Sequence, residues 1–297
     1  MFWTIALISV SMFPHQQAGV YMIKLYNDDC LNILKTIEDK SIDLVITDCP
    51  YHIVSGGCSN GAYGDGNGIF TKQHHEPKGI LNHRREYERD AQTGRQVLKG
   101  TKHINLGGDV LNDNSTYARQ GKLFKHNDIE FKDWLPEVYR VLKDNTHCYI
   151  MINARNLKDL QTEAEKVGFE FQQILIWDKG NATPNRYYLN AFEMILMLRK
   201  GSAKNINNMG TTNIIRTKNI IGNKYHPTEK PVELMEILVE NSSNENDLVM
   251  DCFMGAGATA IACRNLNRNF IGIEIDERYF NKANERLEKE KQQLKLF

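Results

Sequence analysis

The chain has 297 residues, of which 41% are hydrophobic and 25% charged, and its 37 basic and 37 acidic side chains cancel. This is the composition of an ordinary globular protein with one large domain or two small ones. Because the net charge is zero, a nucleic-acid partner would have to contact a local basic patch rather than the whole surface. No apolar run reaches the length of a transmembrane helix, so we expect no membrane partner.

The cysteines are scattered along the chain and include no Cys-x-x-Cys pair. They are Cys30, Cys49, Cys58, Cys148, Cys252 and Cys263. This pattern is typical of a reducing compartment and favours neither a disulfide framework nor a zinc site. We therefore expect a cytoplasmic protein that binds no metal.

The first 21 residues differ from the rest. The stretch from Phe2 to Phe13 is largely apolar, and the first basic residue is Lys24. A secretory signal would have a basic start and a small-residue cleavage site, and neither is clear here. We interpret residues 1–21 as an N-terminal extension outside the fold, with a weak membrane anchor as the alternative.

From Met22 onward, apolar patterning predicts strands that alternate with helices. Strands are expected at 22–27, 42–48, 147–152, 172–178, 191–199, 247–251 and 269–275, and helices at 31–38, 128–143, 156–167, from about 228, at 257–265 and at 277–293. This alternation favours an α/β fold with a doubly wound, mostly parallel sheet. The single domain would cover residues 22–297.

Two stretches interrupt the pattern. Residues 52–70 contain six glycines, and residues 71–127 are polar and weakly periodic. We interpret 52–127 as a loop-rich insertion at the edge of the sheet where the strands end, because a long loop in a compact domain is usually functional or disordered. Residues 201–225 are rich in Asn, Thr and Gly and are also expected to form a loop.

A short polar motif follows the buried strand at 42–48. It consists of Asp48, Cys49, Pro50 and Tyr51. In open α/β sheets, ligands bind at the carboxyl ends of the strands. The motif is therefore a candidate site, although a turn with an Asp cap and a packed Tyr would have the same sequence pattern.

A second motif joins the strand at 247–251 to the next helix. It contains Gly255 and Gly257, and Glu274 ends the following strand 19 residues after Gly255. Glycines at a strand–helix turn let the backbone approach a ligand, and an acidic residue so placed can bind both ribose hydroxyls. This predicts an adenosyl-type ligand; the alternative is a tight turn with Glu274 as a helix cap. Because few residues follow Glu274, the other half of the sheet must come earlier, as in a circular permutation.

Four motifs now occur in a recognisable order. They are Asp48-Cys49-Pro50-Tyr51, Trp177-Asp178-Lys179-Gly180-Asn181, His226-Pro227-Thr228-Glu229-Lys230-Pro231 and Phe253-x-Gly255-x-Gly257. Over residues 22–54 and 128–285 the chain resembles the β class of DNA amino-methyltransferases, and phage-type solitary enzymes are the most similar. The resemblance implies a circularly permuted Rossmann-like methyltransferase fold, S-adenosylmethionine as cofactor and double-stranded DNA as partner, in a bacterial or phage-infected cell.

The resemblance also implies which base is methylated. Asp-Pro-Pro-Tyr is the usual adenine-N6 signature of this class, and Ser-Pro-Pro-Tyr usually marks cytosine-N4. The implied roles are that Asp48 and the Cys49 carbonyl accept the two amino hydrogens, that Tyr51 stacks on a flipped-out base, and that Pro50 shapes the turn. Cytosine-N4 methylation, methylation of RNA or protein, and a DNA-binding module without catalysis remain alternatives.

Cofactor binding is assigned by the same resemblance and by the two glycines. The candidate cofactor-binding residues are Asp29, Thr228, Lys230, Asp251, Phe253, Gly255, Gly257 and Glu274. Thr228 is expected to cap a helix whose first turn holds Lys230 and Pro231. That helix N-terminus, together with Lys230, would bind the methionine carboxylate.

Two cysteines stand where the class normally has proline. Cys49 lacks the rigidity of proline but keeps the carbonyl group, and Cys252 follows Asp251. Neutral replacement by a small residue is the favoured explanation. The alternative is a thiol-sensitive site in which the helix N-terminus after Gly255 lowers the pKa of Cys252.

The insertion is the candidate DNA-binding segment. Residues 72–126 carry 11 basic and six acidic residues, and their histidines show no metal-ligand spacing. The residues selected for DNA contact are Arg84, Arg85, Arg89, Arg95, Lys99 and Lys102. A solvated loop is the alternative. No nuclease motif is apparent, and the oligomeric state is open, with a homodimer among the possibilities.

Overall fold

The computed structural model describes residues 21–50, 87–89, 96–98, 129–183, 188–202, 204–220, 225 and 228–294. The chain divides into two compact units, Met1–Tyr51 with Asp128–Phe297 and His52–Asn127, and each is described by itself. In the smaller unit, β3 (Tyr87–Arg89) pairs antiparallel with β4 (Gln96–Leu98), a pairing that the weakly periodic sequence did not predict. The proposed extension at 1–21 lies outside the described residues except for Tyr21.

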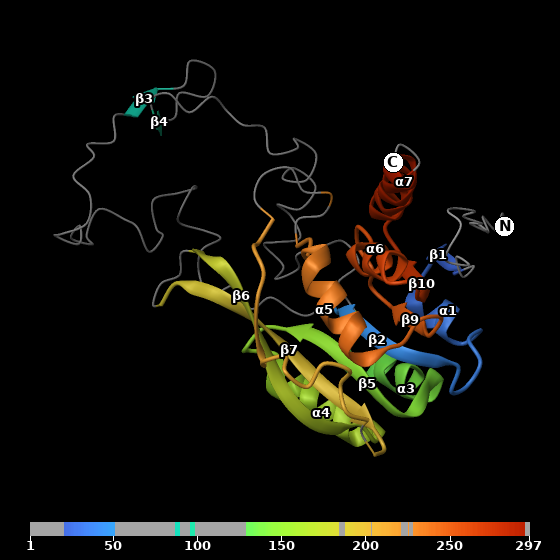
Figure 1. The fold of residues 1–297 in the computed structure, drawn as a ribbon. Coiled ribbons are helices and arrows are strands. Elements are labelled where there is room, and N and C mark those ends of the chain that lie inside the picture. The colour runs from blue at the N-terminus through green and yellow to red at the C-terminus, as the bar shows by residue number, and fades with distance from the viewer. Residues whose placement is uncertain are drawn as a thin grey trace. The chain divides into compact units, whose positions relative to one another are not determined.

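In the larger unit the described residues form an eight-stranded sheet in the order β1-β10-β9-β2-β5-β7-β6-β8 (Figure 1). Its strands are β1 (Ile23–Asn27), β2 (Ile42–Asp48), β5 (Leu142–Ile152), β6 (Glu170–Thr183), β7 (Asn190–Lys200), β8 (Ile214–Arg216), β9 (Leu248–Asp251) and β10 (Asn269–Glu274). Its helices are α1 (Cys30–Leu34), α3 (Phe131–Val141), α4 (Leu157–Val167), α5 (Val232–Ser242), α6 (Ala258–Asn265) and α7 (Glu277–Leu294). No helix in the described ranges is long and apolar enough to cross a membrane.

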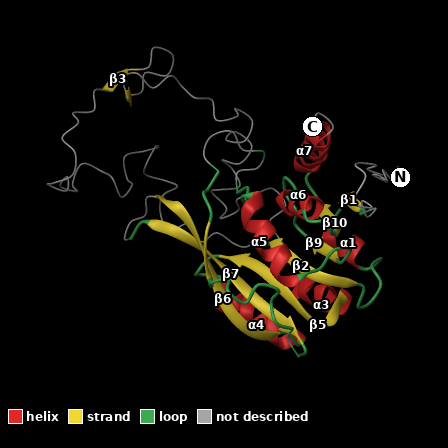
Figure 2. Ribbon diagram, viewed as in Figure 1, coloured by secondary structure: helices red, strands yellow, loops and turns green. Residues whose placement is uncertain are grey.

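The sheet is mostly parallel, as predicted. The strands from β1 to β5 in spatial order run parallel, and β7 is antiparallel to both of its neighbours. The late strands β9 and β10 lie between the early strands β1 and β2, which is the order that a circular permutation requires (Figure 2). All five parallel strands therefore end at one edge, the carboxyl edge, where β6 also ends and β7 begins.

Apolar side chains bury both faces of this sheet. Along β2, Leu44 and Ile46 pack in a cluster with α5, α6 and α7, whereas Ile42 and Val45 pack in a second cluster with α1, α3 and α4. Successive side chains of a strand point to opposite faces, so Leu44, Val45 and Ile46 alternate between the two clusters. A register shift between Ile42 and Leu44 accounts for the position of Ile42. A strand covered on both faces is therefore largely apolar. This explains why the Ile42–Asp48 run was recognisable as a buried strand with those bounds.

Several boundaries differ from the prediction: α3 ends at Val141 and β5 begins at Leu142, although a helix to 143 and a strand from 147 were expected, and β6 extends to Thr183 rather than 178. Helix α5 begins at Val232 rather than near Thr228, and its N-cap is Pro231 in an extended conformation without a side-chain cap. The proline explains this, because the residue before a proline is disfavoured in the helical region, so Lys230 cannot lie in a first turn. The expected capping by Thr228 is therefore wrong. The loop predicted at 201–225 also contains strand β8, which pairs with β6.

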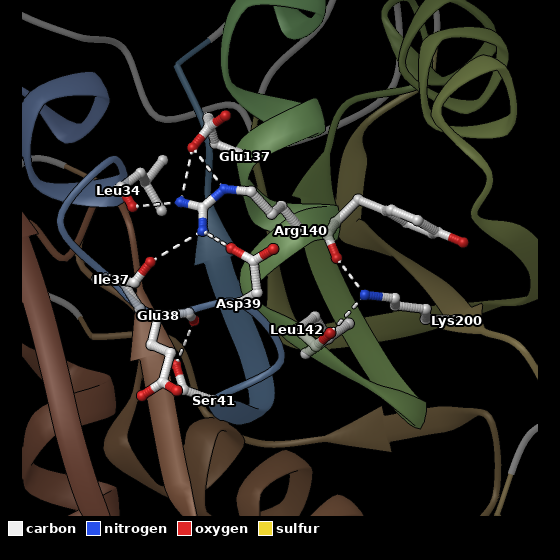
Figure 3. Close-up of polar contacts among 10 residues, drawn as sticks. Leu34, Ile37, Glu38, Asp39, Ser41, Glu137, Arg140, Leu142 and Lys200 are labelled. Atoms are coloured by element: carbon white, nitrogen blue, oxygen red, sulfur yellow. Dashed lines mark hydrogen bonds and ion pairs between the residues drawn. The ribbon is translucent and has the colours of Figure 1, made fainter.

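At the opposite edge of the sheet, where β2 and β5 begin, charged groups tie α1 to α3 (Figure 3). The Arg140 guanidinium donates to the carbonyls of Leu34 and Ile37, at 2.7 and 2.9 Å, and pairs with Asp39 and Glu137. Nearby, Lys200 Nζ donates to the carbonyls of Tyr139 and Leu142, each at 2.6 Å. We call Arg140, Asp39, Glu137 and Lys200 the Arg140 network; its two cations bond to backbone carbonyls at or just beyond the ends of α1 and α3.

Candidate active site

The two motifs selected from the sequence lie side by side at the carboxyl edge. Strand β2, which ends at Asp48, pairs in parallel with β9, which ends at Asp251. The Thr47 hydroxyl donates to Asp251 Oδ1 at 2.8 Å and so joins the two strand ends. The strands that carry the two motifs are therefore direct neighbours in the sheet.

The Asp48 carboxylate is largely enclosed and is paired with a lysine. Its side chain is 25% exposed, and its Oδ2 lies 2.6 Å from Nζ of Lys230, whose side chain is 9% exposed. Burial raises the pKa of the Asp48 carboxyl, the Lys230 ammonium acts in the opposite direction, and the Glu193 carboxylate adds to the rise. The site therefore contains a carboxylate whose ionisation depends on one buried cation.

This pair belongs to a longer set of contacts. Lys230 Nζ lies 3.4 Å from Oε2 of Glu193, and Glu193 Oε1 lies 3.4 Å from Nζ of Lys179. We call Asp48, Lys230, Glu193 and Lys179 the Asp48 network. Glu193 was not among the residues predicted from the sequence, although an acidic residue within the apolar run of β7 was a usable signal.

Strand alternation explains how the Asp48 network forms. Ile46, Trp177 and Ile195 all belong to the apolar cluster on the α5 face. Asp48, Lys179 and Glu193 are each two positions from one of these residues, so they extend the same face towards the carboxyl edge. Lys230 reaches them from the segment that leads into α5.

The same alternation places the two unusual cysteines elsewhere. Cys49 and Cys252 are 2% and 1% exposed and belong to the cluster on the α1 and α3 face. Both are free thiols, and burial raises the pKa of each thiol well above its usual value. The pKa of Cys252 therefore shifts in the direction opposite to the one that the thiol-sensitive hypothesis predicted, because burial disfavours the thiolate.

The glycine turn after β9 has the backbone that only glycine adopts readily. Gly255 and Gly257 have φ angles of +53° and +75°, and Gly257 is the N-cap of α6. A Cβ added at Gly257 would also lie 3.1 Å from the Cβ of Ala283 on α7. No side-chain cap bonds to the α6 N-terminus among the described residues, so its first N–H groups suit an anion.

Glu274 lies at the end of β10 and contacts this turn. Its Oε2 accepts from the Gly255 N–H at 2.9 Å, and its Oε1 accepts from the Asp276 N–H at 2.8 Å. Burial raises the pKa of the Glu274 carboxyl to about 7, against the effect of these two hydrogen bonds. A carboxylate has about four acceptor positions, so two remain for hydroxyl donors.

The other candidate cofactor residues have contacts within the protein. Both oxygens of the buried Asp251 accept bonds, from the hydroxyls of Thr47 and Thr259 and from the Phe253 N–H, and burial raises its pKa to about 6. Asp251 therefore shapes the turn. The Phe253 ring packs edge-on against Trp134, with centroids 5.3 Å apart. Asp29 accepts from the Leu31 N–H and caps α1, directly after the strand that pairs with β10.

Several predicted residues fall outside the described residues. They are Tyr51, Arg84, Arg85, Arg95, Lys99 and Lys102. Arg89 ends β3, but its side chain is not described. Thr228 is described, and its carbonyl accepts a hydrogen bond from Lys230 Nζ at 3.1 Å. The structure therefore brings Asp48, the glycine turn, Glu274 and Lys230 to one edge of the sheet.

The permuted α/β sheet, with the Asp48 motif beside the glycine turn, has the architecture that the sequence resemblance implied. Residues 42–285 match the family model described as DNA methylase, N6_N4_Mtase, and the chain belongs to this family. The resemblance to the DNA amino-methyltransferases is thereby confirmed.

Individual relatives have low sequence identity to this chain but match most of its length. The type II methyltransferase M2.LlaDCHI of Lactococcus lactis subsp. cremoris is 23% identical, over 93% of this chain and 96% of its own length. The crystal structure of the M1.HpyAVI–SAM complex has a TM-score of 0.56 and 23% identity, over 89% of this chain and all of that one. The cytosine-N4-specific PvuII DNA methyltransferase has a TM-score of 0.58 and 16% identity, over 89% and 86%. These structures share the fold.

Proposed function

We propose that this DNA methylase uses S-adenosylmethionine to methylate the N6 amino group of a flipped-out adenine. The observation that carries the proposal is the position of the Asp48 carboxylate, at the end of β2 and one strand away from the glycine turn. An aspartate at the first position of the motif supports adenine over cytosine through the resemblance described above.

The amino group of adenine is a poor nucleophile because its lone pair is delocalised into the ring. Asp48 accepts one amino hydrogen and the Cys49 carbonyl accepts the other, which orients the nitrogen. Positive charge then develops on the nitrogen as it attacks, and the carboxylate stabilises that charge more in the transition state than in the ground state. S-adenosylmethionine, when bound, supplies an electrophilic methyl group.

The residues around the glycine turn fit such a cofactor. The Gly255–Gly257 turn lets a ligand approach the backbone, and the α6 N-terminus suits a carboxylate. The Glu274 carboxylate suits the ribose hydroxyls, and Asp29 lies at the next strand end. Lys230 remains a candidate for the methionine carboxylate, but its ammonium is paired with Asp48, so we assign the α6 N-terminus the larger part.

DNA contact is assigned to the basic insertion. Reversing the charges of Arg84, Arg85 and Arg89 together should weaken DNA binding. For each phosphate that the variant no longer neutralises, the slope of log affinity against log salt should fall by about 0.9. Fluorescence anisotropy of a labelled duplex at several salt concentrations measures this slope, and an unaltered slope would remove the three residues from the interface.

Product analysis tests the proposed reaction. The protein is incubated with S-adenosylmethionine and genomic DNA, and the digested nucleosides are identified by mass spectrometry. N6-methyladenine is the expected product. N4-methylcytosine would overturn the choice of base, and methylation of RNA or protein with unmodified DNA would overturn the choice of substrate.

A further inference from the structure

The Asp48 network is a series of negative and positive side chains from three strands and from the segment before α5. Asp48 ends β2, Lys230 precedes α5, Glu193 lies near the start of β7 and Lys179 near the end of β6. The separations of the nitrogen and oxygen atoms along this series are 2.6, 3.4 and 3.4 Å. Each carboxylate faces a lysine and each lysine faces a carboxylate, so the four charges cancel.

Burial makes these contacts necessary. The side chains of Lys230 and Lys179 are each 9% exposed, and an ammonium removed from water is costly unless a carboxylate compensates it. Lys230 is also held locally, because its Nζ donates to the Thr228 carbonyl and Pro231 restricts its backbone. The lysine nearest to Asp48 is therefore held from two sides.

We propose that Glu193 and Lys179 are positioning residues, which hold Lys230 against one oxygen of Asp48 and leave the second oxygen to accept from the target amino group. The proposal rests on the proposed methyl transfer to a base. In this arrangement Lys230 keeps the carboxylate ionised and fixes its orientation, Glu193 holds Lys230, and Lys179 compensates Glu193.

The charges around Asp48 give Glu193 two opposite effects. The ionisable groups that act on Asp48 are Lys230, which favours the carboxylate, and Glu193, which disfavours it. Asp251 on β9 is also coupled to the Asp48 charge. With Lys230 present, Glu193 supports Asp48 by holding the lysine. Without Lys230, only the repulsion remains, and it promotes protonation of Asp48.

These two effects predict that Glu193→Gln lowers the rate of methyl transfer when Lys230 is present and raises it when Lys230 is replaced. In the otherwise wild-type protein, Glu193→Gln should lower single-turnover methyl transfer by about tenfold. Lys230→Met should lower it further and move the acidic limb of the pH–rate profile to higher pH. In the Lys230→Met background, adding Glu193→Gln should raise the rate and move that limb back towards lower pH.

A second cycle does not depend on Lys230→Met folding. Lys179→Met should lower the rate several-fold in the wild-type background and have almost no effect when Glu193→Gln is already present, because Lys179 acts through Glu193. Lys166→Met, which removes an exposed lysine paired with Glu163 on α4, is the matched control and should leave the rate unchanged. Calorimetric titration with S-adenosylmethionine should give the wild-type dissociation constant for Glu193→Gln, Lys179→Met and Lys166→Met, because none of these residues is assigned to the cofactor.

The outcomes separate this inference from the proposed function. If the wild-type protein methylates DNA and the effects of Glu193→Gln are equal in both backgrounds, with an unmoved acidic limb, the positioning role is wrong. Additive effects of Lys179→Met and Glu193→Gln would also overturn it. A wild-type protein that binds S-adenosylmethionine but methylates no nucleic acid would instead overturn the proposed function, and the role that rests on it.

Discussion

The Asp48 network and the Arg140 network lie at opposite edges of the same sheet and use similar residues differently. In the Arg140 network, Arg140 and Lys200 donate to four backbone carbonyls, in addition to their carboxylate partners. In the Asp48 network, both lysines face carboxylates, and Lys230 also donates to the Thr228 carbonyl. Saturated backbone acceptors serve the fold, whereas a buried carboxylate with acceptor capacity left over can serve a ligand.

The largest effect should come from removing the carboxylate at the carboxyl edge. Asp48→Ala should lower methyl transfer at least about a thousandfold, because the developing charge on the amino nitrogen loses its partner. The dissociation constant for S-adenosylmethionine should change by less than about threefold, since we propose that Asp48 contacts the base and not the cofactor. Asp144→Ala, which removes an exposed carboxylate near Lys200, is the control and should be active. Equal loss of cofactor binding and transfer would count against the assignment.

The next effect concerns the cofactor side of the carboxyl edge. Glu274→Gln keeps the shape of the side chain but removes the charge that ribose hydroxyls would contact. The dissociation constant for S-adenosylmethionine should rise by about 10- to 100-fold, in line with charge-assisted hydrogen bonds. Isothermal titration calorimetry measures this constant, and an unchanged value would remove Glu274 from the site.

The same carboxyl predicts a pH dependence of cofactor affinity. Burial raises the pKa of Glu274 to about 7 in the unliganded protein, and hydroxyl donors from a ribose would lower it by favouring the carboxylate. The affinity should therefore be full above pH 7 and fall as the pH drops below 7, by at most about tenfold per pH unit. Calorimetry from pH 5.5 to about pH 8.5 tests this, and Glu274→Gln should abolish the dependence.

Breaking the Arg140 network should affect stability alone. Arg140→Met should lower the free energy of unfolding by about 1–3 kcal/mol, because two carbonyls and two carboxylates lose their donor. The rate per folded molecule should be unchanged. Lys132→Met removes an exposed ion pair at the start of the same helix and should leave the free energy of unfolding almost unchanged. Denaturant titration measures the stability of both variants, and parallel assays measure their activity. A loss of rate per folded molecule in Arg140→Met would contradict the purely structural role of the Arg140 network.

The smallest effect is expected at the cysteines. Alkylation of the native protein should leave Cys49 and Cys252 unlabelled, because both are buried and burial raises the pKa of both thiols. Peptide mapping should find the label at both positions only after unfolding. Rapid native labelling that bound S-adenosylmethionine prevents would restore the thiol-sensitive hypothesis.

The sequence predicted what local patterns control and missed what tertiary pairing controls. The strand Ile42–Asp48 is rich in β-branched and apolar residues and is followed closely by Pro50, so its bounds were recognisable. Strand β8 has three residues in a polar segment and exists through pairing with β6, which no local signal shows. The start of α5 is an exception, because Pro231 shifts it through a local effect on Lys230 that the sequence does contain.

In the site, too, local motifs were predicted from the sequence, whereas contacts between distant residues were not. The Asp48 motif, the glycine turn and Glu274 were recognisable because each lies at the end of a predicted strand, and parallel strands end at one edge. The pairing of Lys230 with Asp48 was not, because 182 residues separate them and the strand order decides which ends meet. The role of Glu193 could not be predicted either, because the face of the sheet on which it lies follows from the pairing of β7 with β5 and β6.

The structure of the protein with duplex DNA and an unreactive S-adenosylmethionine analogue tests the proposed function most directly. We expect a flipped adenine whose N6 lies within about 2.7–3.2 Å of the Asp48 carboxylate and of the Cys49 carbonyl, with the analogue's ribose at Glu274. A cytosine in that position, or a target base that remains stacked in the duplex with Asp48 contacting no base, would contradict it.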